Sequence, residues 1–196
     1  MNIDELAEKA EANFHKHLEE NSYPGRGIVI GCDPGGNPVL IYWIMGRSSN
    51  SRNRLFNLNL EGGLKTEAAD SSLLEDPSLI IYNAVLPSKQ GFLVTNGDHT
   101  DRILVKMENG KTFLEAMHDE KHEPDPPNFT PRIAGLMTLV ASEQKIELAL
   151  VCKSSLSSEL SEVHYHHFPF VKKAFGYCIT TYMKDGDPLP HFQKNG

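Results

Sequence analysis

The sequence is poor in cysteine, lacks a long apolar run and has no excess of positive charge. Its three cysteines, Cys32, Cys152 and Cys178, are odd in number and lack the close spacing of metal-binding motifs. We therefore expect buried thiols in a reducing compartment. No stretch approaches the ~20 apolar residues that cross a membrane, and the start of the chain is acidic, unlike a signal peptide. These absences predict a cytoplasmic protein with no membrane partner.

The charge balance argues against nucleic acid as a partner. Asp and Glu number 26 against 19 Lys and Arg, which gives a net charge of −7. A protein that binds nucleic acid generally needs a basic face. In so acidic a chain a local group of arginines is informative, and Arg47, Arg52 and Arg54 all fall within the segment Gly46–Arg54.

The apolar pattern predicts a single α+β domain over residues 1–196, dominated by antiparallel sheet. Apolar residues recur at three- and four-residue steps over 3–20, which indicates an amphipathic helix within an N-terminal extension, 1–22. Pairs of β-rich runs joined by turn residues predict three hairpins, 27–31 with 39–45, 79–86 with 91–95, and 133–141 with 145–153. The other expected elements are strands at 55–60 and 177–183, helices at 101–107 and 112–117, a polar connection at 62–76, a loop at 118–128 and a polar tail from 185.

The segment Gly46–Arg54 is the most informative part of the chain. It holds three arginines, three serines and two asparagines, and it has no acidic side chain. Arginine matches the geometry of phosphate, and serine hydroxyls and loop amides complete such a site. The alternative is a solvated loop whose arginines pair with surface carboxylates. The density of donors favours an anion site, and we expect a phosphate ester as the ligand.

Four further polar motifs lie at the ends of predicted elements. They are Tyr23-Pro24-Gly25-Arg26 before a strand, Tyr82-Asn83 closing the strand at 79–81, Asn96-Gly97-Asp98-His99-Thr100-Asp101 before a helix, and a proline-rich loop with Glu123 and Arg132. Each has a plainer interpretation, as a turn, a core-edge pair, a helix cap and an exposed loop. A metal site from Asp98, His99 and Asp101 is poorly spaced. Glu123 suits an acid or a base on a stiffened loop.

The run His164-Tyr165-His166-His167 invites a metal-binding interpretation. In a strand His164 and His166 share one face and His167 lies on the other. No cysteine or carboxylate follows at ligand spacing. We therefore predict a half-exposed strand and no metal site.

Taken together and in this order, the motifs resemble those of the archaeal-type IMP cyclohydrolase family. The matching pieces are Tyr23-x-Gly25-Arg26, Arg47-Ser48 with Asn53-Arg54, Tyr82-Asn83, Asn96-Gly97-x-His99-Thr100-Asp101 and Thr130-Pro131-Arg132. The resemblance runs from about Tyr23 to Ala141, so the N-terminal helix lies outside it.

The resemblance implies a fold and a reaction. The fold is the four-layered αββα sandwich of N-terminal-nucleophile hydrolases, although a helix here precedes the first core strand, where the nucleophile of those hydrolases stands. The reaction is a step of purine biosynthesis, the closure of 5-formamidoimidazole-4-carboxamide ribotide to IMP with loss of water. It needs no metal or redox cofactor. The expected partner is a small purine ribotide, and a homo-oligomer is expected.

The resemblance also implies roles for single residues. The catalytic residues are Arg54 for the oxyanion, Glu123 for proton transfer and Tyr82 for positioning or for relaying a proton. The substrate-binding residues are Tyr23, Arg26, Arg47, Ser48, Asn53, Asn83, Asn96, His99, Asp101 and Arg132. Two alternatives stay open, a purine-nucleotide-binding protein on the same fold without turnover and an amide hydrolase with a processed N-terminal nucleophile.

Overall fold

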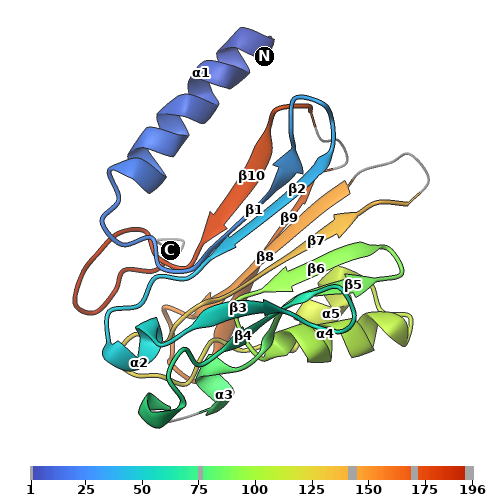
Figure 1. The fold of residues 1–196 in the computed structure, drawn as a ribbon. Coiled ribbons are helices and arrows are strands. Elements are labelled where there is room, and N and C mark those ends of the chain that lie inside the picture. The colour runs from blue at the N-terminus through green and yellow to red at the C-terminus, as the bar shows by residue number, and fades with distance from the viewer. Residues whose placement is uncertain (1, 75–76, 141–144, 169–171, 193–196) are drawn as a thin grey trace.

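The computed structural model describes residues 2–74, 77–140, 145–168 and 172–192. Their strands form two antiparallel sheets (Figure 1). The smaller sheet has the order β10 (Gly176–Thr180), β1 (Gly27–Cys32), β2 (Pro38–Trp43). The larger sheet has the order β3 (Leu55–Leu58), β4 (Leu64–Glu67), β5 (Asn83–Ser88), β6 (Gly91–Thr95), β7 (Arg132–Thr138), β8 (Lys145–Lys153), β9 (Ser161–Phe168). The predicted α+β fold with mainly antiparallel sheet is confirmed.

Helices are fewer and mostly short. They are α1 (Ile3–Phe14), α2 (Ser49–Arg52), α3 (Pro77–Ile80), α4 (His99–Glu108) and α5 (Phe113–Met117), with a π-helical turn η1 (His15–Glu19) and a 3-10 turn η2 (Ser71–Leu73). The predicted helices at 101–107 and 112–117 correspond to α4 and α5. Within the described part of the chain, no helix combines the length and the apolar character that a membrane crossing requires.

The three predicted hairpins are present, and the turn between β1 and β2 shows why. Ile28 pairs with Tyr42 across this hairpin. Oδ1 of Asp33 accepts from the backbone N–H of Asn37 at 2.8 Å, and Oδ2 accepts from Nδ2 of Asn37 at 2.8 Å. The side chain of Asp33 thus fixes the turn locally, which is why the sequence alone could predict it.

The sequence-based prediction is wrong in two places. The connection at 62–76 contains β4, a four-residue strand whose polar Thr66 is fully buried and donates from Oγ1 to the carbonyl oxygen of Ile80 at 2.6 Å. Residues 79–81 do not form a strand, because α3 begins at Pro77, where proline suits the first helical turn. Tyr82 therefore precedes β5 and does not close a strand.

Two apolar clusters hold the layers together. Between the sheets, Ile30 of β1 packs in one buried cluster with Leu148 of β8. On the opposite face of the larger sheet, α4 and α5 cover a second cluster in which Phe113 lies with Val151 (Figure 1). Gly135 of β7 permits the close approach of the sheets, because a Cβ atom there would lie 2.6 Å from Cδ1 of Ile30. The molecule is thus a small sheet, a large sheet and a helical layer, in that order.

The N-terminal helix stands apart from these layers. The predicted helix at 3–20 is confirmed by α1 and η1, and α1 begins with a capping box in which Asn2 and Glu5 bond to each other's backbone N–H groups. None of its residues is buried, and it projects beyond the sheets in Figure 1. Because α1 buries no side chain, it does not form a packed fourth layer.

Candidate active site

The candidate site lies at one end of the sheets, where β1, β5 and β7 begin and β2 and β6 end (Figure 1). Its centre is a buried ion pair between Arg26, just before β1, and Glu123, in the loop before β7. Nη1 of Arg26 donates to Oε1 of Glu123 at 2.6 Å and to the carbonyl oxygen of Asn96 at 2.8 Å. The two side chains are only 14% and 8% exposed. Burial opposes the charge of Arg26, but the carboxylate of Glu123 raises the pKa of Arg26 above its ordinary value.

The proline-rich loop that carries Glu123 is fixed from two sides. The backbone N–H of Glu123 donates to the carbonyl oxygen of Thr130 at 2.9 Å. Asp125 accepts from the backbone N–H and the hydroxyl of Thr130 at 2.6 and 2.5 Å, and Tyr182 bonds to the same hydroxyl at 2.8 Å. The plainer interpretation of Glu123 as an exposed loop residue is therefore wrong, since packing and Arg26 hold its carboxylate inside the molecule.

Two tyrosines from different sheets meet beside this ion pair. The hydroxyl groups of Tyr42, on β2, and Tyr82, before β5, lie 2.8 Å apart. Burial raises the pKa of Tyr42 well above its ordinary value, and Tyr82 adds to this effect, while the charges of Arg26 and Arg54 oppose it. These interactions place both arginines near Tyr42, so the tyrosine pair belongs to the same buried cluster as the ion pair.

Sequence reasoning missed Tyr42. It stands in the apolar run 39–45 that predicted a strand, and nothing in that run marks it as functional. Tyr42 pairs across the hairpin with the buried Ile28. A tyrosine at such a position needs a hydrogen-bond partner for its hydroxyl group. That need is the signal that could have identified Tyr42 from the sequence.

Arg54 completes this cluster with donors that have no acceptor among the described residues. It follows α2, and its neighbour Asn53 fixes the chain by exchanging two hydrogen bonds of 2.7 Å with the backbone of Asp70. Nε and Nη1 of Arg54 are buried and have no hydrogen-bond partner in the described part of the chain. Burial lowers the pKa of Arg54, and the nearby charge of Arg26 lowers it further. Glu123 pairs directly with Arg26 and acts on Arg54 only through its charge, which leaves the cluster with an excess of positive charge and with two unpartnered donors of Arg54.

The other side chains of the segment Gly46–Arg54 have separate partners and do not point to one place. Ser48 caps the short helix α2 by accepting from the backbone N–H of Ser51 at 3.0 Å. Nε of Arg52, an exposed residue, donates to the carbonyl oxygen of Gly46 at 2.7 Å and not to the buried cluster. Arg47 lies over the ring of Tyr23 at 5.4 Å and donates to the carbonyl oxygen of Gly186 at 2.9 Å. The segment therefore does not form one continuous anion site. Its polar groups cap α2, bond to Gly46 within the segment, and contact Tyr23 and Gly186 outside it.

Tyr23 links the outer arginine to the inner ones. Burial raises its pKa, and the charges of Arg47, Arg26 and Arg54 act against this shift, so Tyr23 lies within electrostatic range of all three. Its hydroxyl donates to the carbonyl oxygen of Met45 at 3.1 Å. The structure thus brings Tyr23 and these three predicted arginines around one region and leaves Arg52 outside it.

Three of the other predicted binding residues are engaged in bracing the loops. The side chain of the fully buried Asn96 donates to the carbonyl oxygen of Pro131 and accepts from the backbone N–H of Ile133, both at 2.9 Å. Asn83 donates to Asp101 at 2.8 Å, which ties the start of β5 to α4. Asn96 still reaches the site through its backbone, because its carbonyl oxygen accepts from Arg26.

His99 and Arg132 form a separate group. Nη1 of Arg132 donates to Asp98 at 2.6 Å and lies 2.9 Å from Nδ1 of the fully buried His99. Nε of Arg132 donates to the carbonyl oxygen of Lys121 at 2.8 Å. Asp98 stands at the N-cap position of α4 but makes no cap hydrogen bond with its side chain, which pairs with Arg132 and Arg102. The helix-cap interpretation of this motif is therefore wrong for Asp98. A ligand-binding role for His99 and Arg132 stays a prediction.

Comparison with known proteins agrees with the motifs. The chain belongs to the IMP cyclohydrolase-like protein family, whose model matches residues 23–195. An IMP cyclohydrolase from Haloarcula marismortui is 28% identical over 128 residues, an alignment that covers 62% of this chain and 57% of the relative. The chain thus spans little more than half the length of that relative. The predicted family is confirmed, and the family match continues past Ala141, where the recognised motifs end.

Proposed function

We propose that this protein closes 5-formamidoimidazole-4-carboxamide ribotide to IMP with loss of water. The observation that carries the proposal is the pair of buried, unpartnered nitrogen atoms of Arg54 beside the Arg26–Glu123 ion pair. Family membership supports a purine ribotide as substrate, and the relative's name supports the reaction.

Glu123 and Arg54 carry the first half of the proposed reaction. The carboxamide nitrogen attacks the formyl carbon, and it is a poor nucleophile until a base removes its proton. We assign that proton to Glu123, whose carboxylate Arg26 holds in place. The formyl oxygen gains negative charge during the attack, and Nε and Nη1 of Arg54 are free to donate to it. One such donor typically contributes about 10²–10³-fold to the rate.

The tyrosine pair serves the second half. The oxyanion takes a proton from Tyr82 or Tyr42, whose hydroxyls form a two-member chain. The proton that Glu123 removed restores the phenol, and the new hydroxyl group leaves as water with the proton of the formamido nitrogen. The raised pKa of Tyr42 keeps this phenol protonated and able to donate. Because the reaction is intramolecular, holding the two arms of the substrate together supplies much of the remaining acceleration.

Arg47 and Tyr23 are our candidates for the phosphate end of the ribotide. Arg47 is 42% exposed and its ion pair with Asp185 is long, at 3.4 Å. An exposed pair of this kind contributes little stability, so a phosphate competes for the guanidinium at low cost. The ring of Tyr23, over which the guanidinium of Arg47 lies, keeps Arg47 at the outer side of the arginine cluster.

We place the three observed layers within the αββα sandwich of N-terminal-nucleophile hydrolases, but without the mechanism of those enzymes. An amide hydrolase of that kind needs a chain that is processed to begin at Ser, Thr or Cys. Mass spectrometry of the purified protein separates the two, because an intact Met1, or loss of Met1 alone, would exclude the processed enzyme.

The direct test mixes the pure chain with the formamido ribotide and follows IMP by absorbance. We expect turnover by the wild type and a loss of at least ~10²-fold in kcat/KM for Arg54→Ala and for Glu123→Gln. Arg52→Ala is the matched control, because Arg52 lies in the same segment but is exposed and turned toward Gly46. Near-normal turnover in both site variants would refute the assignment. Tight binding of IMP without turnover by the wild type would instead favour a nucleotide-binding protein.

A further inference from the structure

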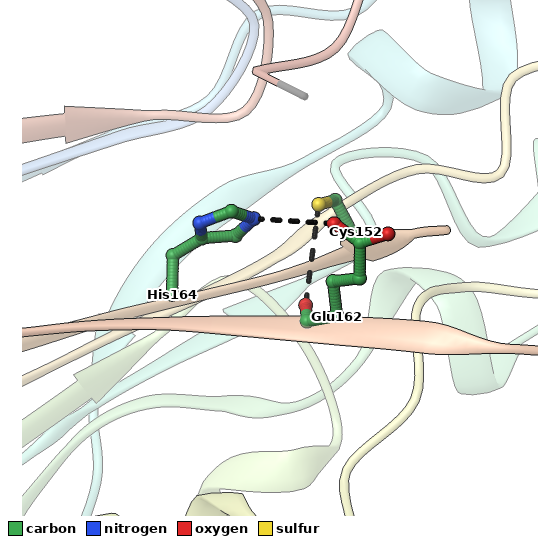
Figure 2. Close-up of side chains that lie close together, drawn as sticks. All are labelled: Cys152, Glu162 and His164. Carbon is green, nitrogen blue, oxygen red and sulfur yellow. Dashed lines mark hydrogen bonds and ion pairs between the residues drawn. The ribbon is translucent and has the colours of Figure 1, made fainter. Parts of the chain in front are cut away.

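The strands β8 and β9 bring together three side chains that sequence spacing does not connect. Cys152 of β8 lies opposite Glu162 of β9 in the ladder, and His164 follows two residues later. Residues two apart in a strand point to the same face, so all three side chains share one face of the larger sheet. Their ligand atoms, a sulfur, a carboxylate oxygen and an imidazole nitrogen, all lie within 4.8 Å of one another (Figure 2).

The cluster has an imidazole nitrogen without a conventional partner. Nε2 of His164 is buried and accepts or donates no hydrogen bond within the described residues, and it lies 3.8 Å from Oε2 of Glu162. A buried polar atom without a partner is costly. The histidine side chain as a whole is 23% exposed, so an ion can reach the cluster from solvent.

The other two groups are available on the same side. Oγ of Ser154 donates to Oε1 of Glu162 at 2.7 Å, which orients the carboxylate and leaves Oε2 toward His164. Cys152 is fully buried, and among the described residues its thiol donates over long distances, 3.9 Å to the carbonyl oxygen of Glu162 and 3.7 Å to that of Phe192. In metal sites the ligating side chains are commonly held in place by hydrogen bonds from neighbouring groups. Ser154 holds the carboxylate of Glu162 in this way.

We propose that Cys152, Glu162 and His164 bind a zinc ion that ties the edge strand β9 to β8. A thiolate, an imidazole and a carboxylate together suit zinc, whereas magnesium and calcium prefer oxygen ligands alone. Three protein ligands leave one position of a tetrahedral ion for water or for a nearby oxygen such as the carbonyl of Phe192. Binding releases the thiol proton of Cys152 to solvent, because the thiolate is the form that bonds to metal.

The spacing rule that argued against a metal in the run 164–167 considered residues that follow along the chain. The carboxylate precedes the histidine by two positions, and the cysteine comes from the neighbouring strand. The site is independent of the proposed cyclohydrolase reaction, because its three side chains contribute to none of the Arg26, Arg54, Glu123 or tyrosine contacts described above.

Zinc binding to the full chain tests the proposal directly. The protein is stripped with a chelator, desalted and titrated with Zn²⁺ against a chromophoric competitor, and separately with Co²⁺ as a spectroscopic probe. We expect one zinc per chain and a near-ultraviolet thiolate-to-cobalt charge-transfer band. Cys152→Ser removes the band, and His164→Gln and Glu162→Gln weaken zinc binding. Ser154→Ala weakens it about 10–100-fold through the carboxylate that it orients.

Two variants serve as controls for unspecific binding. His166→Gln changes the next histidine on the same face of β9, and Cys178→Ser removes the exposed thiol of β10. Both should bind zinc as the wild type does, with circular dichroism confirming that each variant is folded. The proposal is overturned if the wild type retains no zinc, if Cys152→Ser and His164→Gln both retain one zinc per chain, or if the cobalt band disappears with Cys178→Ser. Should Cys152→Ser not fold, the comparison of His164→Gln with His166→Gln decides.

Discussion

Replacing Glu123 by alanine should destabilise the protein far more than replacing an exposed carboxylate. Glu123→Ala leaves Arg26 charged, 14% exposed and without its 2.6 Å partner. Removing one member of a buried ion pair typically costs about 3–5 kcal/mol, because the other charge is left uncompensated. Native domains are stable by only about 5–15 kcal/mol, so this change removes a large part of the total.

The magnitude converts into a measurable shift. For a chain of this size, 1 kcal/mol corresponds to about 2–4 °C in Tm, so Glu123→Ala should lower Tm by roughly 6–20 °C. Calorimetry and urea titration of the purified chain measure Tm and the free energy of unfolding. Asp185→Ala is the matched control, since Asp185 pairs with Arg47 where the side chains are 53% and 42% exposed. Its effect should stay within about 0–1 kcal/mol.

The refuting result is a Glu123→Ala protein whose free energy of unfolding falls by less than about 1 kcal/mol, the range of an exposed pair. Arg26 would then reach solvent or another acceptor, and the buried ion pair described here would be absent in solution. Adding Arg26→Met to Glu123→Ala removes the stranded charge. The double variant should therefore recover part of the lost stability, which a merely steric effect of the alanine would not allow.

Two further predictions concern the tyrosine pair and pH. Tyr42→Phe should lower kcat about tenfold, the equivalent of about 1.4 kcal/mol in activation free energy. Loss of its hydrogen bond to Tyr82 should also cost about 0.5–1.5 kcal/mol of stability, a fall of roughly 1–6 °C in Tm. Tyr177→Phe on β10 is the control, and equal activity of the two variants would remove Tyr42 from the proposed site. Burial, reinforced by Arg132, holds the pKa of His99 well below 6.5, so the unfolded chain binds a proton that the folded chain does not. Stability is then complete above pH ~6.5 and falls as the pH drops below it. Urea titrations from pH 8 to 5 should show a smaller loss for His99→Gln than for the wild type, and identical slopes would contradict this. His122 and His191 have lowered pKa values from burial too, so only the difference between the two proteins counts.

Local chemistry made much of the fold predictable. The turn at Asp33 and Asn37 closes through contacts four residues apart, and the helix at 3–20 shows its period directly. The prediction missed the strand β4 because four residues are too few to show a period, and because the partner of the buried Thr66, Ile80, is 14 residues away along the chain. Pro77 began a helix where the apolar run suggested a strand. Predictions failed where tertiary contacts outweighed a short local pattern.

The site shows the same division. Charge counting found the arginines, but it could not tell that Arg54 points inward while Arg52 bonds to Gly46. Nor could it tell that Glu123 is buried, because its partner Arg26 is 97 residues away along the chain. The motif order recovered the family without this geometry, since it depends on residue types and spacing alone.

The cluster of Arg26, Arg54 and Glu123 carries an unbalanced charge, which bears on both stability and the proposed reaction. Arg26 has a carboxylate and a backbone oxygen as partners, whereas Arg54 has a lowered pKa and two buried nitrogen atoms without an acceptor. In a chain of net charge −7, surface carboxylates are plentiful, yet none is placed against these atoms within the described residues. A second carboxylate would stabilise the fold but would occupy the donors that an oxyanion needs. In the reaction proposed above, the developing negative charge of the substrate would supply the acceptor that Arg54 lacks among the described residues.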